Sequence, residues 1–382
     1  MIAAVRLALC VAPIAVVPLP GSTSSGAAPV GSPVERTDPI REVARLQETV
    51  AARPNDPAAL AALAAAYGRL EDPRAEELYR RAVRIRPRDR SLRVGLAQLL
   101  WRAGRFDDGN AEMERALASS PPDRRLRIRY AEGLAAQSRF VQAARELERA
   151  CRAGTCDVDT LEMWALALTQ TGRFEEAAAA WSRAIQTDAS RASSRYGLGQ
   201  LLLLRGKPET AERELAEAAR LQADAAPIRV DLGRALEAEG RLADAERQYG
   251  EALRLDPTLS RARYALGTVL AREGRGGEAR EEIARYQSLF EREQELVQRK
   301  RARHARAALG WTKLRAGDAA AALDAFEGVG DDPAALRGRA AALWSLGRLE
   351  EAVRTLEQAV RLAPGDVALR WALIRAREGA SP

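Results

Sequence analysis

The fold is decided by residues 226–257, which read APIRVDLGRALEAEG (226–240) followed by RLADAERQYGEALRLDP (241–257). In both halves apolar residues recur every three or four positions, as they do along one face of an α-helix. Gly240 lies where the first helix should end in a left-handed turn, and Pro257 follows the second helix and stops it. The segment therefore predicts two short amphipathic helices joined at Gly240.

The same arrangement returns every 34 residues. The turn position forms a column of small residues, in which serine fills one slot: Gly104, Ser138, Gly172, Gly206, Gly240 and Gly274. Two alanine columns share this period: Ala116, Ala150, Ala184, Ala218 and Ala252, and Ala143, Ala177, Ala211, Ala245 and Ala279. Small residues at one constant period indicate a stack of helical hairpins, in which each hairpin buries its apolar surface against its neighbours.

These units resemble tetratricopeptide repeats, whose 34-residue pattern is W-x2-L-G-x2-Y, then A-x3-F, then P. Matching positions are the Leu-Gly pairs Leu198-Gly199, Leu232-Gly233 and Leu266-Gly267, the pairs Ala177/Trp181 and Ala245/Tyr249, and Pro87, Pro121, Pro257 and Pro364. The tryptophan slot departs from the pattern and holds Arg229 and Arg263 in two repeats. The resemblance covers about residues 55–382. It implies an all-α fold, a right-handed α-solenoid superhelix of tandem helix-turn-helix repeats.

The phase of the repeat predicts how the chain is organised. We expect an N-terminal capping helix over 40–54, about seven repeats over 55–293, a charged insertion over 294–302, two further repeats over 303–366, and a C-terminal capping helix over 367–382. The insertion is placed where the spacing of the turn glycines changes, between Gly274 and Gly317. The last helix should present Arg370, Arg375, Arg377 and Glu378 to water, because the end of a stack has no further neighbour.

The N-terminal residues differ in composition from the repeats. Arg6 precedes the apolar stretch LALCVAPIAVVPLP (7–20), and small and polar residues follow it. This is the order of a secretory signal peptide. We therefore expect a signal peptide over 1–27, a flexible linker over 28–39, and an exported protein, periplasmic or extracellular, with no membrane span in the mature chain. The alternatives are an uncleaved membrane anchor and a cytoplasmic protein.

Two cysteines lie at a junction between repeats that lacks the usual closing proline. Cys151 and Cys156 are five residues apart. In an exported protein a disulfide between them could take the place of the proline, whereas the alternative is two free thiols. The C-x4-C spacing, with no second pair and no histidine nearby, is not a zinc pattern.

The residues needed for the common catalytic arrangements are missing. His304 is the only histidine, so Ser-His-Asp and Cys-His sets lack a member. No phosphate-binding loop of the form G-x-x-x-x-G-K-[ST] occurs. The sequence therefore indicates no enzyme, no cofactor, no metal site and no small-molecule substrate.

The chain is basic, with 60 Lys and Arg against 53 Asp and Glu and a net charge of +7. Nearly all of the basic residues are arginine, whose planar guanidinium pairs well with carboxylates. Acids are interleaved with these bases and no recognised nucleic-acid motif occurs, which argues against nucleic acid as the ligand. An acidic protein partner fits this charge.

In the family that the chain resembles, the first helix of each repeat lines a groove that holds a partner peptide or helix. Its exposed positions are the second, fifth, ninth, twelfth and thirteenth of each unit. Candidate groove residues at these positions are Trp101, Arg102, Arg125, Tyr196, Gln200, Arg234, Arg261, Tyr264, Arg272, Trp311, Arg315 and Arg337. For each aromatic candidate the alternative is packing between neighbouring helices.

The insertion belongs to the stretch EREQELVQRKRARHAR (291–306), whose second half is basic without an acid. We interpret it either as an elongated, solvated helix that spaces two groups of repeats, or as a docking site for an acidic partner or an anionic surface.

Together these patterns predict a non-catalytic scaffold or adaptor that binds a protein partner in its groove. The alternative is an accessory recognition subunit of an envelope enzyme system, for example in polysaccharide synthesis or secretion.

Overall fold

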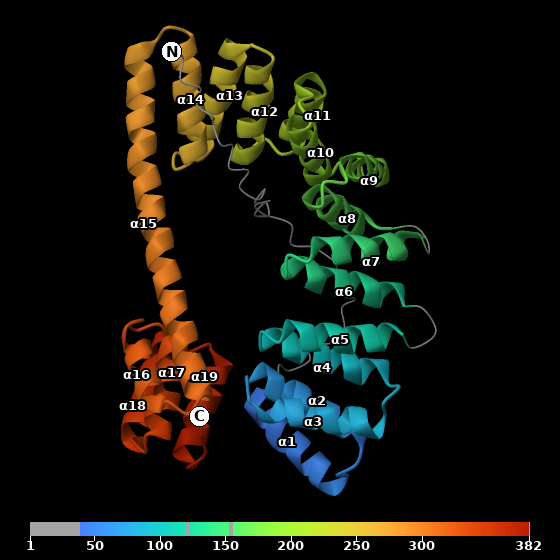
Figure 1. Cartoon of the computed structure of the whole chain (residues 1–382), viewed down its shortest axis with the longest axis vertical. Coiled ribbons are helices and arrows are strands. Elements are labelled where there is room, and N and C mark those ends of the chain that lie inside the picture. The colour runs from blue at the N-terminus through green and yellow to red at the C-terminus, as the bar shows by residue number, and fades with distance from the viewer. Residues whose placement is uncertain (1–38, 119–122, 153–155, 382) are drawn as a thin grey trace, which may run out of the picture. The chain divides into compact units, whose positions relative to one another are not determined.

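The computed structural model describes residues 39–118, 123–152 and 156–381. These residues form nineteen α-helices and no β-strand, which confirms the all-α prediction (Figure 1). The expected signal peptide over 1–27, and all but the last residue of the expected linker, lie outside the described residues. The chain divides into two compact units. The central unit contains Asp123–Arg292, and the terminal unit contains Ala28–Pro122 together with Glu293–Pro382.

The central unit is a series of helical hairpins that follow the predicted period. Its helices are α6 (Arg124–Ala136), α7 (Phe140–Arg152), α8 (Val158–Gln170), α9 (Phe174–Thr187), α10 (Ala192–Leu204), α11 (Pro208–Leu221), α12 (Ala226–Ala238), α13 (Leu242–Leu255), α14 (Ser260–Arg272) and the first part of α15 (Gly276–Arg315). The two helices of each hairpin pack on each other, and the second of them packs on the first helix of the next hairpin.

The terminal unit combines helices from both ends of the described chain. They are α1 (Pro39–Ala52), α2 (Pro57–Arg69), α3 (Arg74–Ile85), α4 (Arg90–Arg102), α5 (Phe106–Leu117), the second part of α15, α16 (Ala319–Glu327), α17 (Pro333–Ser345), α18 (Leu349–Leu362) and α19 (Val367–Arg377). Helix α1 packs on α2 through the buried Val43, at the place where the sequence predicts the N-terminal cap.

The turn inside each hairpin closes as the glycine column predicts. At Gly240 the φ angle is +78°, and the N–H of Arg241 donates to the carbonyl of Leu236 at 2.9 Å. The equivalent glycines at 104, 172, 206 and 274 also have positive φ, with the same bond across each turn. Glycine is needed here because a side chain disfavours the left-handed region.

Ser138 adopts the same left-handed turn, with a φ of +59°, although it carries a side chain. Replacing Ser138 with glycine should therefore raise the free energy of unfolding by about 0.5–1 kcal/mol, because the backbone strain is removed. The matched change is Gly172→Ser at the next turn, where an added Cβ atom would meet nothing within 4 Å. It should destabilise by a similar amount, as measured by urea unfolding. Equal stabilities of all three proteins would contradict this account of the turn.

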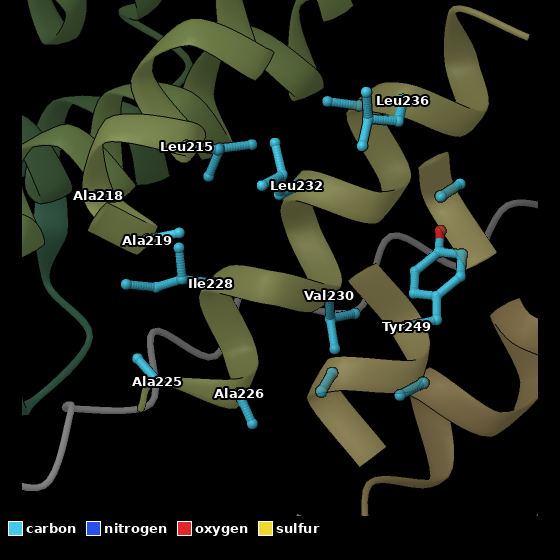
Figure 2. Packing of buried hydrophobic residues seen from close by; sticks show 14 of the residues in the cluster. Leu215, Ala218, Ala219, Ala225, Ala226, Ile228, Val230, Leu232, Leu236 and Tyr249 are labelled. Carbon is cyan, nitrogen blue, oxygen red and sulfur yellow. The ribbon is translucent and has the colours of Figure 1, made fainter. Parts of the chain in front are cut away.

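The remaining small-residue columns permit close approach between helices. Every alanine in the two columns is buried. A Cβ atom on Gly233 would lie 2.6 Å from the ring of Tyr249, and one on Gly199 would lie 2.6 Å from Leu215. Figure 2 shows the side chains of Tyr249, Val230 and Leu232 within the buried cluster of α11–α14. Small residues are therefore required where the two helices of a hairpin touch.

Arginine in the tryptophan slot has a structural role that the sequence did not reveal. In four repeats this arginine forms an ion pair with a glutamate on the second helix of its own hairpin: Arg93 with Glu112, Arg127 with Glu146, Arg195 with Glu214 and Arg263 with Glu282, at 2.6–3.0 Å. Arg229 donates to Gln248 in the same way. The residue in this slot thus joins the two helices through a polar contact and not through an aromatic ring.

Helix α15 is the longest helix in the described part of the chain, with 40 residues. It joins the second helix of one repeat, the charged stretch and the first helix of the next repeat without a break. The expected insertion over 294–302 is a continuous part of this helix. No glycine or proline lies between Gly277 and Gly310, so nothing in the backbone interrupts the helix.

Cys151 lies near the end of α7, and the structure joins it to Cys156 by a disulfide, with their Cα atoms 5.4 Å apart. Both residues are buried against Leu161 and Ala184. The bond therefore lies at the junction of two repeats, where the closing proline is missing.

The C-terminal helix differs from the expectation at Arg375. Its side chain is only 16% exposed and donates to the carboxylate of Asp72 at 3.2 Å. Trp371 also donates to Asp72, at 2.9 Å, and its ring lies 6.3 Å from that of Tyr67. Within the terminal unit, α19 thus packs on the end of α2. Arg375 does not point to water as we expected, whereas Arg377 is exposed.

Candidate partner-binding surface

Four of the predicted groove residues meet at one buried carboxylate, Asp231 on α12. Its Oδ2 accepts hydrogen bonds from the hydroxyl of Tyr196 and from Nε2 of Gln200, both at 2.9 Å. Its Oδ1 accepts from Nη1 of Arg234 at 2.9 Å and from Nη2 of Arg261 at 3.4 Å. We call these five residues the Asp231 cluster.

The cluster joins the first helices of three successive repeats, because Tyr196 and Gln200 lie on α10 and Arg261 lies on α14. Stacking of the repeats brings these helices near one another, so side chains about 30 positions apart in the sequence can bond to the same carboxylate. These four candidates therefore lie around one carboxylate.

Asp231 and its two arginine partners differ in their exposure to solvent. The side chain of Asp231 is 1% exposed, whereas those of Arg234 and Arg261 are 53% and 69% exposed. A buried carboxylate needs such partners, since an unpaired one costs several kcal/mol. The two arginines hold the carboxylate with one side of their guanidinium groups and expose the other side to solvent.

Tyr196 acts as a donor to this carboxylate. Burial raises the pKa of its hydroxyl, and the neighbouring Asp231 charge raises that pKa further. The hydroxyl therefore keeps its proton at any physiological pH, and the hydrogen bond to Asp231 persists.

A second carboxylate on α12, that of Glu237, binds another candidate, Arg272. Glu237 accepts from Arg272 of α14 at 3.0 Å and from the hydroxyl of the buried Tyr249, also at 3.0 Å. Burial and the charge of Glu237 raise the pKa of Tyr249. Arg272 is thus tied to the hairpin core, although about half of its side chain is exposed.

Tyr264 and Arg125 are the other candidates of the central unit. Tyr264 is exposed on α14, one turn after Arg261, and its ring centroid lies 5.1 Å from that of Tyr286. Arg125 is exposed on α6 and is not part of the Asp231 cluster.

The five candidates of the terminal unit contact other residues of that unit. The indole of Trp101 donates to Asn110 of α5, and Trp311 packs edge-on against Phe326 of α16. Both aromatic side chains thus pack between helices, which is the alternative that the sequence left open. The arginine contacts are with backbone or loop: Arg102 with the carbonyl of Gly68, Arg315 with the carbonyl of Trp311, and Arg337 with Glu71.

Asp231 itself was missed by the sequence reasoning. It occupies the sixth position of its repeat, which is not one of the exposed positions expected to line the groove. The signal was present, because Asp231 stands between the apolar Val230 and Leu232 within the first helix. An acid in that place requires a buried partner.

Among the described residues no group of three or more His, Cys, Asp or Glu side chains could hold a metal ion. Within the same ranges, none of the helices has the length and apolar character needed to cross a bilayer.

Comparison with known proteins identifies the family. One model of the tetratricopeptide repeat matches residues 94–155, 162–227 and 230–294, and a second matches residues 333–376. The first alone covers more than half of the chain, which therefore belongs to the tetratricopeptide-repeat family. A search of the curated proteins finds no match.

Several solved structures are similar. YrrB, described as a TPR protein with an unusual peptide-binding site, is 18% identical, covers 49% of this chain and 96% of its own, and gives a TM-score of 0.43. MamA from Desulfovibrio magneticus RS-1 is 20% identical over 45% of this chain and 96% of its own, with a TM-score of 0.43. Another MamA structure is 19% identical over 43% and 96%, with a TM-score of 0.41. Each likeness covers less than half of this chain.

Proposed function

We propose that this protein is a non-catalytic scaffold that binds an acidic segment of a protein partner on the surface around Asp231. Membership of the tetratricopeptide-repeat family supports a role in protein–protein interaction. The observation that carries the finer proposal is the pair of arginines, Arg234 and Arg261, held by one buried carboxylate and open to solvent on the other side.

The chemistry of this surface defines the ligand. Two guanidinium groups beside one carboxylate leave a local excess of positive charge, and guanidinium groups bind carboxylates through paired N–H donors. Because Asp231 already orients both arginines, a ligand carboxylate meets donors that have lost part of their freedom before binding. Tyr264, one turn from Arg261, adds exposed aromatic area for an apolar side chain. A peptide with an apolar residue flanked by acids fits these features.

Neutralising both arginines should weaken such a ligand by about 1–3 kcal/mol while the helical content stays unchanged. We choose glutamine rather than glutamate for both positions, as Arg234→Gln with Arg261→Gln, because a glutamate at 234 would also repel Asp231. A random peptide display library selected on the wild-type protein should yield acidic peptides with an apolar residue. Their affinity should fall on the variant and with rising salt concentration.

The matched control is Arg247→Gln with Arg254→Gln on α13. These arginines are similarly exposed, and each pairs with an acid three residues away, as Arg234 does. The control should bind the selected peptides like the wild type. Equal losses in both variants would mean that net charge and not the Asp231 cluster governs binding.

We also propose that the protein is exported. The order of charge, apolar residues and small residues in 1–27 supports this, and a disulfide at Cys151–Cys156 suits an oxidising compartment. Amino-terminal sequencing of the protein from its native cells should find a mature start between about residues 21 and 29, where the apolar stretch ends. An intact Met1 on soluble cytoplasmic protein would disprove export.

A further inference from the structure

Helix α14 carries two arginines that are held in the same way. Arg261 donates to Asp231 of α12 at 3.4 Å. Arg272 donates to Glu237, which also lies on α12, at 3.0 Å. The side chains of Arg261 and Arg272 are 69% and 49% exposed, whereas those of the two acids are 1% and 25% exposed. Each acid thus orients one guanidinium group, and the exposed part of that group offers N–H donors to a ligand.

The two arginines lie on one face of α14. They are 11 residues apart, which is three helical turns plus about 20°, so their Cα atoms lie roughly 16 Å apart along the helix axis. The side chains between them on this face are short. Thr268 lies seven residues after Arg261, and Ala271 is exposed next to Arg272. A ligand that lies along α14 can therefore reach both guanidinium groups.

The two ends of this face differ in character. Tyr264, the one exposed large hydrophobic residue of α14, lies one turn after Arg261 and is 51% exposed. At that end two arginines, Arg234 and Arg261, share one carboxylate. At the other end Glu237 balances the charge of Arg272. We therefore expect the end at Arg261 to bind an acid more tightly, with an apolar side chain beside it.

We propose that the ligand of this surface is an extended peptide segment with two acidic residues, the first bound at Arg261 and the second at Arg272. An apolar residue close to the first acid contacts Tyr264. In an extended chain about five residues span the roughly 16 Å between the arginines, and about one or two residues span one turn of α14. This inference rests on the proposed function, because it extends the same site along α14.

An extended segment suits this face better than a helix does. A docked helix buries a stripe of apolar side chains, whereas α14 offers a single exposed ring between two charged groups. The short side chains of Thr268 and Ala271 leave room for the backbone of a strand-like segment. The spacing of the two acids along such a segment is therefore the feature that this face recognises.

The test measures the binding of labelled synthetic peptides to the full chain by fluorescence anisotropy. Each peptide carries a glutamate, a leucine about two positions later and a second glutamate, with serine elsewhere. The two glutamates are about three to eight positions apart in successive peptides, and each sequence is also made reversed so that both chain directions are sampled. Affinity should be highest at a spacing of about five. Arg261→Gln should weaken that peptide about tenfold and Arg272→Gln about threefold, since the charge of Arg272 is already balanced.

A change in the peptide assigns each acid to its arginine. Replacing the glutamate far from the leucine with glutamine should abolish the effect of Arg272→Gln and leave that of Arg261→Gln. The matched control is Arg254→Gln, an exposed arginine on α13 that pairs with Glu251, and it should bind like the wild type. If circular dichroism shows that Arg272→Gln unfolds, Arg272→Lys replaces it. Lysine keeps the charge beside Glu237 but removes the guanidinium fork, so it should also weaken binding.

The outcomes separate this inference from the proposed function. The inference is overturned by affinities that stay unchanged in the Arg272 variants, or that do not vary with the spacing of the two glutamates. In either case a loss of affinity in Arg261→Gln would leave the proposed function standing. Affinities that stay unchanged in Arg261→Gln as well would overturn both.

Discussion

Replacing Asp72 with alanine is expected to lower the free energy of unfolding by about 3 kcal/mol, as when a buried ion pair loses one partner. The side chain of Asp72 is fully buried and accepts from Arg74, Trp371 and Arg375. Its loss leaves the largely buried Arg375 without its carboxylate, and the indole N–H of Trp371 without an acceptor. Urea unfolding followed by circular dichroism measures the change.

The same site predicts a pH dependence. Burial acts to raise the pKa of Asp72, but the hydrogen bonds from Arg74 and Trp371 outweigh it and hold the pKa below its ordinary value. The group therefore contributes stability above its unfolded pKa of about 3.9, and that contribution is lost as the pH falls through the lower folded pKa. The difference between the wild type and Asp72→Asn should thus be full at neutral pH and shrink in strong acid.

Glu77→Ala is the control for Asp72, because Glu77 is an exposed acid on the neighbouring α3. Its removal should change the free energy of unfolding by less than about 0.5 kcal/mol. If both variants unfold alike, the contact between α2 and α19 does not stabilise the protein.

Replacing Gly233 with valine should destabilise the central unit by about 3 kcal/mol, the upper range for overpacking a core. The new Cβ would lie 2.6, 2.9 and 3.0 Å from three atoms of the Tyr249 ring. That ring is completely buried, so it can move only by displacing α12 or α13. Thermal and urea unfolding should show the loss.

Two further variants test whether the contact with the Tyr249 ring causes this loss of stability. Gly250 is an exposed glycine in α13 with nothing near its Cβ position, so Gly250→Ala should stabilise by about 0.5–1 kcal/mol. In a Tyr249→Ala background the space of the ring is vacated, and Gly233→Val should cost less than it does alone. Additive losses in the double variant would show that the clash is not with Tyr249.

The sequence by itself determined the repeat, the ends of most helices and the buried small residues. Gly240 ends α12 because a left-handed residue is needed there, and Gly233 is small because α13 passes close by. These requirements involve neighbours within one hairpin, and every hairpin repeats them. A period of 34 residues therefore makes them visible in the sequence.

Only the tertiary structure decided which side chains share a partner. Tyr196, Gln200 and Arg261 reach Asp231 from two other helices, and Trp371 reaches Asp72 from almost 300 residues away. Trp101 had the correct spacing for the groove, yet its indole turns to Asn110 within its own hairpin. Spacing along a helix gives the direction of a side chain, but the choice of partner depends on what the packed neighbours bring within hydrogen-bonding distance. The cost of burying a charge then selects the arrangement in which each carboxylate finds its donors.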